Sequence, residues 1–228
     1  MTGVYYFSGS GHSRAVAAAI SGMLHCGVAE IGRDSGVDLM DGTIVVVFPV
    51  YCQNIPAPVK TFLRNVRAEH VVLIAVYGKI SYGNVLYEAK RLVHTQVIAG
   101  AYIPMGHTFL SGDACFDEAF LLPIVQRIRS PQKAHIPKSR KNLLADVFPA
   151  LRSRLSVKIT KNDRCDNCGT CEENCPAGAI RSGKIHSGCI RCMRCVSQCP
   201  RHALQYKNIR ILQRYLERHC KEEYVLYL

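Results

Sequence analysis

The sequence predicts an α/β domain with a five-stranded parallel sheet and helices on both faces, followed by a small α+β domain that is rich in cysteine. Two observations carry this prediction. Apolar, β-rich runs alternate with helical patterns through the first 130 residues, and eight of the twelve cysteines fall between Cys165 and Cys199. The 228 residues, 48% hydrophobic and 20% charged, suit two unequal globular domains and exclude a disordered or fibrous chain.

The first domain is expected over residues 1–130. Two of its predicted strands, TIVVVFPVY and HVVLIAVYG, are apolar along their length, as strands covered by helices on both sides must be. A basic inter-domain segment at 131–156 and a second domain at 157–228, ending in a helix from about residue 208 to 224, complete the chain. The predicted strands are 4–7, 28–32, 43–51, 70–77 and 96–105, and the predicted helices of the first domain are 13–24, 56–66, 83–95 and 116–130.

Ligands on parallel sheets bind beyond the carboxyl ends of the strands, so the loops there are candidate binding elements. The loop after the first strand is suited to an anion, because small residues let the backbone turn tightly, hydroxyls donate hydrogen bonds and a helix N-terminus follows. It is neither GxxxxGK[ST] nor GxGxxG, which argues against a nucleoside triphosphate or a dinucleotide. The alternative is a tight turn in which Ser13 caps the helix. The loop consists of Ser8, Gly9, Ser10, Gly11, His12 and Ser13.

Two further loops, after the third and fourth strands, combine aromatic, amide and glycine residues. Such residues can stack on a planar ring and bind its edges through hydrogen bonds. The residues in question are Pro49, Val50, Tyr51, Cys52, Gln53 and Asn54 in one loop, and Tyr77, Gly78, Tyr82, Gly83 and Asn84 in the other.

With these three loops, residues 1 to about 130 resemble the flavodoxin family. The resemblance implies that the Ser8–Ser13 loop holds the phosphate of FMN and that the other two loops enclose its isoalloxazine ring. The chain has no Trp, so the stacking candidates are Tyr82, Tyr51 and Tyr77, each of which is alternatively a packing residue. His12 stands where many such loops carry Asn or Thr, and it either pairs with the phosphate or lies at the surface.

The cysteines of the second domain form an internal repeat. The runs CDNCGTCEENCPAGAI and CIRCMRCVSQCPRHAL coincide at all four cysteines and the proline when shifted by 24 residues. Each reads CxxCxxCxxxCP and resembles the bacterial two-cluster ferredoxins over residues 157 to about 207. That resemblance implies two [4Fe-4S] clusters with crossed ligands. Cys165, Cys168, Cys171 and Cys199 hold one cluster, and Cys189, Cys192, Cys195 and Cys175 hold the other.

Two structural zinc sites are the alternative interpretation of these cysteines. Zinc needs only four thiolates per site and gives no reason for a repeated fourth cysteine followed by proline, so the spacing favours iron–sulfur clusters. The remaining cysteines are expected to be packing or loop thiols, with Cys52 a contact residue in the flavin loop.

The chain is basic, with a formal net charge of +12 at neutral pH. Two oxidised clusters carry about −2 each and an FMN phosphate up to about −2, which brings the loaded chain to about +6. The remaining charge is concentrated from Arg127 to Lys158, where nine basic residues face one acidic residue, Asp146. This stretch is either a solvated linker or a docking surface for an acidic ferredoxin or flavodoxin-type carrier.

The combination resembles the flavodoxin/ferredoxin fusion proteins of anaerobic bacteria and archaea, which implies electron transfer between FMN and the clusters. The alternative is an enzyme in which FMN oxidises or reduces a small organic substrate and the chain's own clusters supply the electrons. The redox partner of the protein is expected to be either an acidic carrier or a flavin-linked oxidoreductase. A nucleic-acid-binding iron–sulfur protein is disfavoured, because the sequence lacks interleaved aromatics and a fold for that role. No apolar run reaches the ~18 residues of a spanning helix and no signal peptide is visible, so a cytoplasmic location is expected.

Overall fold

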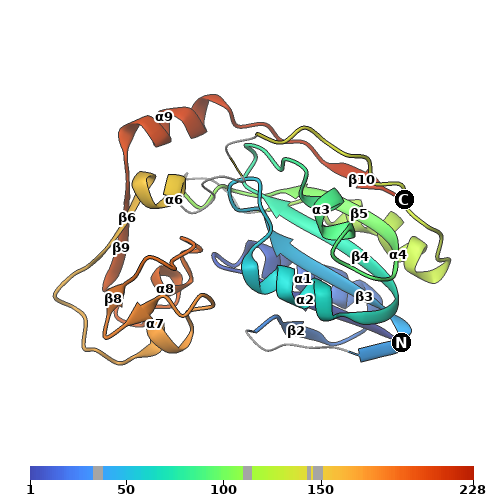
Figure 1. Cartoon of the computed structure of the whole chain (residues 1–228), viewed down its shortest axis with the longest axis horizontal. Helices are drawn as coiled ribbons and strands as arrows, with labels where there is room; N and C mark the ends of the chain where they lie inside the picture. Colours follow the sequence, from blue (N-terminus) through green and yellow to red (C-terminus); the bar gives the residue numbers. More distant parts are fainter. Residues whose placement is uncertain (33–37, 110–114, 143–144, 146–150) are drawn as a thin grey trace.

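The computed structural model describes residues 1–32, 38–109, 115–142, 145 and 151–228. Its first part is a parallel sheet with the strand order β2-β1-β3-β4-β5, and β10 adds an antiparallel edge, making six strands within the described residues (Figure 1). This is the strand order of flavodoxin-like folds, in which ligands bind where the order reverses, at β1 and β3. The strands are β1 (Thr2–Tyr6), β2 (Val28–Glu30), β3 (Asp38–Pro49), β4 (Arg67–Tyr77), β5 (Gln96–Pro104) and β10 (Val225–Tyr227).

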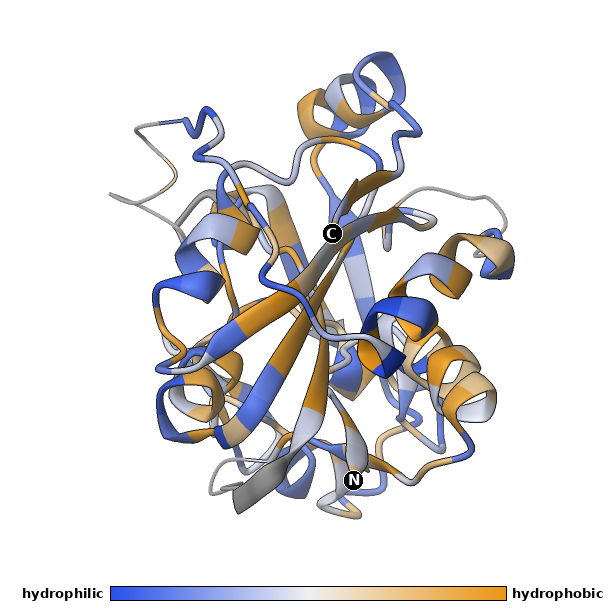
Figure 2. Cartoon of the chain, turned by 90° about the vertical axis from the view of Figure 1, so that its right-hand side faces the viewer, coloured by the Kyte–Doolittle hydropathy of each residue, from blue (hydrophilic) through white to orange (hydrophobic). Residues whose placement is uncertain are grey.

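Helices cover both faces of this sheet, as the apolar strands require. Figure 2 shows hydrophobic residues along the central strands and on the helix sides that face them. Phe62 and Leu86 belong to the core on one face, and Val16 and Ile124 to the core on the other. The covering elements are α1 (His12–Leu24), α2 (Ala57–Asn65), α3 (Val85–Lys90), η1 (Glu118–Leu121) and α4 (Leu122–Arg129).

The C-terminus differs from the expected single helix. Helix α9 (Arg210–Arg218) ends early, and the chain returns to the first domain, where β10 pairs with β5 (Figure 1). On the way, the hydroxyl of Tyr77 donates to the carbonyl of Glu223 at 2.8 Å and accepts from its N–H at 3.0 Å. The expected five-stranded sheet therefore gains a sixth strand from the far end of the chain, because the free edge of β5 offers unpaired backbone groups.

The second part of the chain is small and is built around the repeat. Strands β6 and β9 pair antiparallel, and β7 and β8 form a short hairpin. Each half of the repeat contains one short helix, and Val157 and Leu204 are among the buried residues. The elements are α6 (Leu151–Ser156), β6 (Val157–Lys161), α7 (Thr170–Glu173), β7 (Ile180–Arg181), β8 (Lys184–Ile185), α8 (Arg194–Ser197) and β9 (Leu204–Asn208).

The first part of the basic segment, residues 131–142, packs against the first domain, whereas Arg154 in α6 donates to the carbonyl of Cys189 in the second. Ala134 and Ile136 are buried, and the N–H of Ala134 donates to the carbonyl of Val97 at 2.9 Å. Lys141 forms an ion pair with Glu88 at 2.9 Å. Asp146 lies outside the described residues. No helix among the described residues is long and apolar enough to cross a membrane.

Candidate functional site: two cysteine cavities beside a hydroxyl-lined cavity

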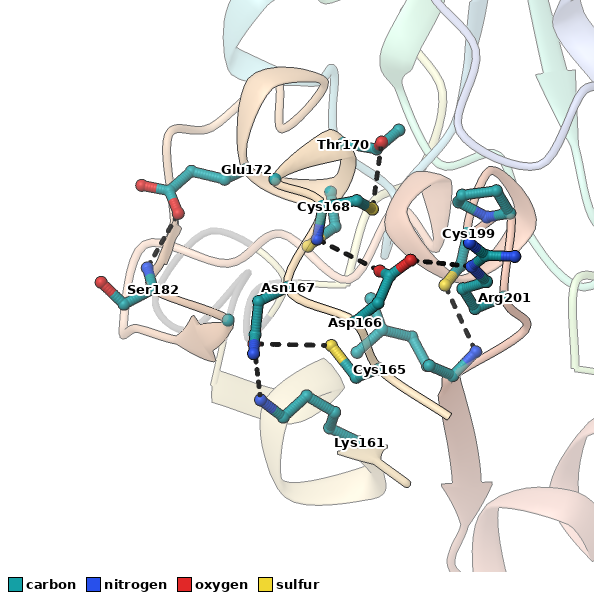
Figure 3. Close-up of a pocket in the computed structure, with 16 residues that line it drawn as sticks. Lys161, Cys165, Asp166, Asn167, Cys168, Thr170, Glu172, Ser182, Cys199 and Arg201 are labelled. Carbon is teal, nitrogen blue, oxygen red and sulfur yellow. Dashed lines mark hydrogen bonds and ion pairs between the residues drawn. The ribbon is translucent and has the colours of Figure 1, made fainter. Parts of the chain in front are cut away.

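Four cysteines from the two halves of the repeat surround one cavity at the surface of the second domain (Figure 3). Three come from the first half and the fourth, Cys199, comes from the end of the second. The cavity measures about 180 Å³, and Asp166 and Arg201 form an ion pair at its rim. Cys168 is exposed, so this site faces solvent. The structure thus brings together Cys165, Cys168, Cys171 and Cys199, the set expected for one cluster.

The other four cysteines line a second, deeper cavity. Three come from the second half of the repeat and Cys175 comes from the first, so the exchange is reciprocal. This cavity measures about 10 Å³, room for about one water, and is much smaller than the first. Its members are Cys175, Cys189, Cys192 and Cys195, of which all but Cys192 are buried.

The two halves share backbone geometry as well as spacing. Left-handed residues occur at equivalent places, with φ of +59° at Asn167 and +54° at Arg191, and +82° at Gly169 and +61° at Met193. The N–H of Ala179 donates to the sulfur of Cys175 at 3.2 Å, and that of Ala203 donates to Cys199 at 3.3 Å. Backbone N–H donors to cysteine sulfur stabilise thiolate charge and tune the potential of a cluster.

Burial and hydrogen bonding shift the pKa of individual thiols in both sets, and burial raises the pKa of Cys171 at the exposed site. Burial raises the pKa of Cys192 to about 11 and that of Cys195 to about 12. At Cys199 the small desolvation is outweighed by backbone N–H donors, which lower the pKa of its thiol. Since a cluster ligand must be a thiolate, loading a cluster at either site displaces protons from its thiols.

A third cavity lies at the carboxyl ends of β1, β3 and β4, where the fold places ligands. The loop after β5 and the Ile190–Cys192 stretch of the second domain complete its wall. The predicted residues that line it are Ser8, Gly9, Ser10, His12, Ser13, Pro49, Val50, Tyr51, Cys52, Tyr77 and Gly78. The residues added by the structure are Val76, Gly106, His107, Thr108, Phe109, Ile190, Arg191 and Cys192.

The first loop has the form of an anion site. Gly11 adopts a φ of +100° before helix α1, and its N–H donates to the hydroxyl of Ser8 at 3.1 Å. Ser10 contacts His12 and Thr108 through its hydroxyl. The hydroxyl of Ser13, by contrast, is fully buried without a partner among the described residues. Ser13 therefore does not cap the helix through its side chain, and its position suits a phosphate oxygen.

Two histidines in this cavity are neutral at physiological pH. Burial lowers the pKa of His12 and lowers that of His107 to about 4, with a further contribution at His107 from His12. Nδ1 of His107 accepts from the N–H of Phe109 at 3.2 Å, so its proton sits on Nε2. Gly78 is required beneath this ring, because a Cβ there would lie 2.5 Å from His107.

The other predicted flavin residues lie outside this cavity. Tyr82 stacks on Tyr102, with ring centroids 3.9 Å apart, and its hydroxyl contacts Glu223. The side chain of Gln53 donates to Ser81 and accepts from the N–H of Asn142. Asn54 accepts a hydrogen bond from Lys141. Asn84 accepts one from the N–H of Ser139. Gly83 packs against Gln53. These residues support the loops and the basic segment in this structure.

The two domains touch at the rim of this cavity. A Cβ on Gly9 would lie 2.0 Å from the carbonyl oxygen of Cys192, so the loop accommodates the second domain only with glycine there. Tyr51 lies at the same junction, where burial raises the pKa of its phenol. Arg191 lines the cavity, and its Nη1 is buried with no partner among the described residues. In the sequence, one feature indicates that Arg191 belongs to this site, which is its position between two cluster cysteines.

The comparison with protein families agrees with the arrangement of the cysteines. Residues 159–181 and 184–205 match the family of 4Fe-4S binding domains, and these spans contain all eight repeated cysteines. Residues 159–205 are a ferredoxin-type 4Fe-4S domain. Its eight cysteines imply two [4Fe-4S] clusters.

Two solved structures resemble the first domain. One is a putative flavoprotein from Bacteroides uniformis ATCC 8492, with 17% identity over 46% of this chain and 91% of that one, and a TM-score of 0.36. The other is a putative flavoprotein from Bacteroides eggerthii DSM 20697, with 15% identity over 56% of this chain and 97% of that one, and a TM-score of 0.39. No curated protein matches the sequence. The flavodoxin-like fold of the first domain is assigned from the strand order of its sheet.

Proposed function

We propose that this protein transfers electrons between FMN in the hydroxyl-lined cavity and the two [4Fe-4S] clusters. One observation carries the proposal: Cys192 lines both this cavity and the deeper cysteine cavity. The FMN site and the buried cluster then share a wall, and no domain movement is needed to bring them together. The exposed cysteine cavity lies at the solvent end of this arrangement.

The residues of the chain divide the work of holding these groups. Ser13 and the N-terminus of α1 bind the phosphate, and the cavity wall formed by Tyr51, Tyr77 and Phe109 surrounds the ring. When bound, FMN exchanges one or two electrons while each cluster exchanges one, so the assembly joins two-electron and one-electron chemistry. The covalent link keeps donor and acceptor at a high effective concentration.

The direct test begins with anaerobic isolation. The loaded chain should contain about one FMN and about eight iron atoms. In anaerobic rapid mixing with a reductant, the rate of flavin-to-cluster transfer should be independent of protein concentration. It should also be nearly flat from low salt to about 0.5 M, where the Debye length falls to a few ångströms. A zinc-filled colourless protein, or a rate that scales with protein concentration, would contradict the proposal.

We also propose an acidic carrier as the external partner. Lys138 and Arg140 are exposed, so they remain available to it, whereas Lys141 is engaged by Glu88 and Asn54. Exchange with an acidic ferredoxin or flavodoxin should slow as salt rises, because screening weakens long-range attraction. Charge reversal at Lys138 and Arg140 should imitate that slowing, with reversal of exposed Arg64 on α2 as the control. If the reversals leave exchange with every acidic carrier unchanged, the segment is only a linker.

A further inference from the structure

The two halves of the repeat differ where the second half meets the first domain. Their cysteines and left-handed residues coincide, but the side chains that contact the phosphate loop or line its cavity have no counterpart in the first half. The ligand geometry is common to both halves, so cluster binding does not explain these differences. In the second half the residues are Arg191, Arg194 and Ser197, and the equivalent residues of the first half are Asn167, Thr170 and Glu173.

Arg194 makes the most extensive of these contacts. It is 8% exposed and lies one residue before Cys195. Its Nε and Nη2 donate to the carbonyl of Ser8 at 3.1 and 2.6 Å, and Nη2 also pairs with the carboxylate of Glu30 on β2. The guanidinium stands 5.2 Å from the centre of the Phe7 ring. Arg194 thus joins the cluster-binding loop to the first turn of the phosphate loop.

This contact determines which way the phosphate loop presents its backbone. The carbonyls of Ser8 and Gly9 face Arg194 and the hydroxyl of Ser197, the latter at 3.3 Å. In a planar trans peptide the N–H points opposite to the carbonyl, so the N–H groups of Gly9 and Ser10 point away from the second domain, that of Gly9 toward the phenol of Tyr51. A carbonyl directed at a phosphate would repel it, whereas an N–H attracts it. By holding these carbonyls toward the second domain, Arg194 and Ser197 keep them away from the position of the anion.

We propose that Arg194 is a positioning residue that couples the two cofactor sites, so that loading of the buried cluster strengthens FMN binding. This inference rests on the proposed function. Cys192 and Cys195 flank the arginine, so a cluster that fixes these cysteines also fixes Arg194 against Ser8. By linkage the effect is reciprocal in free energy, and bound FMN must strengthen retention of the buried cluster by the same amount.

The central experiment compares FMN affinity in three cluster-loaded proteins. Arg194→Thr introduces the residue of the first half, and Arg181→Thr on β7 is the matched control, because Arg181 is exposed and lies in neither cofactor cavity. Dissociation constants for FMN are measured by quenching of flavin fluorescence, after iron and sulfide assays show equal cluster content. Loss of the charged hydrogen bonds should weaken FMN binding by about tenfold or more in Arg194→Thr. Arg181→Thr should match the wild type within about twofold, the spread expected of a surface substitution.

A second readout follows cluster release. With chelator present, iron loss from the wild type should be slower with FMN than with riboflavin, which lacks the phosphate. In Arg194→Thr the two flavins should give equal rates. Equal rates in the wild type, or a fully loaded Arg194→Thr protein that binds FMN as the wild type does, would overturn the coupling.

A variant on the other side of the contact covers the case in which Arg194→Thr fails to load clusters. Glu30→Gln leaves the second domain unchanged and weakens only the ion pair with Arg194. It should retain full iron and still bind FMN several-fold more weakly, and unchanged binding would overturn the inference. If the wild type binds no FMN at all, the proposed function itself fails, which is a different outcome from FMN binding that ignores Arg194.

Discussion

The first half of the cysteine repeat faces solvent, and the second half faces the hydroxyl-lined cavity of the other domain. Both halves have the same cysteine spacing and matching left-handed residues. Their surroundings differ: Cys168 is exposed beside an open cavity, whereas Cys189 and Cys195 are buried and Arg194 is bonded to Ser8. The comparison shows that ligand spacing builds two equivalent metal sites, while a few side chains outside the ligand set decide which site meets the first domain.

The largest expected effect concerns the exchange of ligands between the halves. Cys175→Ala and Cys199→Ala should each reduce iron from about eight to about four per chain. With crossed ligands, Cys175→Ala retains the solvent-facing cluster and Cys199→Ala retains the buried one. The cluster left in Cys175→Ala should therefore decay faster in air. The reverse order of decay, followed by loss of visible absorbance, would refute crossed ligation.

Substitution of Ser13 tests whether the hydroxyl-lined cavity binds the phosphate of FMN. The hydroxyl of Ser13 is buried and has no partner among the described residues, so Ser13→Ala should leave the stability of the protein without flavin unchanged or raise it. FMN affinity should fall by about 10- to 150-fold through loss of a hydrogen bond to a charged phosphate. Riboflavin affinity, measured by the same fluorescence titration, should not change. An equal loss for both flavins would show that Ser13 does not contact the phosphate.

His107 adds a pH dependence to the same cavity. Its pKa falls from an ordinary 6.5 to about 4 on folding, so below pH 6.5 the unfolded chain binds the proton more readily. Stability should therefore decrease as pH falls from 6.5 to 4, by about 2 kcal/mol at pH 5. His107→Gln should remove this part of the acid sensitivity in urea unfolding, whereas His94→Gln, at an exposed position, should not. Parallel curves for wild type and His107→Gln would contradict the assignment.

The smallest expected effect comes from one hydrogen bond of the second half, between Ser197 and Gly9. Ser197 donates to the carbonyl of Gly9, whereas among the described residues its equivalent in the first half, Glu173, makes no hydrogen bond to the phosphate loop. Ser197→Ala should weaken FMN binding by about two- to tenfold, the range of a neutral hydrogen bond. Glu173→Ala should leave it unchanged. Equal effects would mean that the contact with Gly9 has no part in holding the phosphate loop.

The sequence by itself determined the local features of this protein. Apolar runs such as Thr43–Pro49 specified buried parallel strands, and the hydroxyl-rich turn from Ser8 to Ser13 lies in the cavity as expected, apart from Gly11, which shapes the turn. The 24-residue shift identified both cluster motifs, because ligand spacing is a property of a short stretch of chain. Each of these signals depends on residues close together in sequence.

Only the tertiary structure decided the contacts between distant segments. β10 completes the sheet with a pairing between Val225 and Tyr102. A strand of three residues is too short to show a recognisable alternation of apolar and polar residues in the sequence. Tyr82 lies against Tyr102 outside the cavity, and Arg194 reaches Ser8 across most of the chain. Periodicity carries no information about which surfaces meet, because that choice follows from shape and charge once the elements are folded.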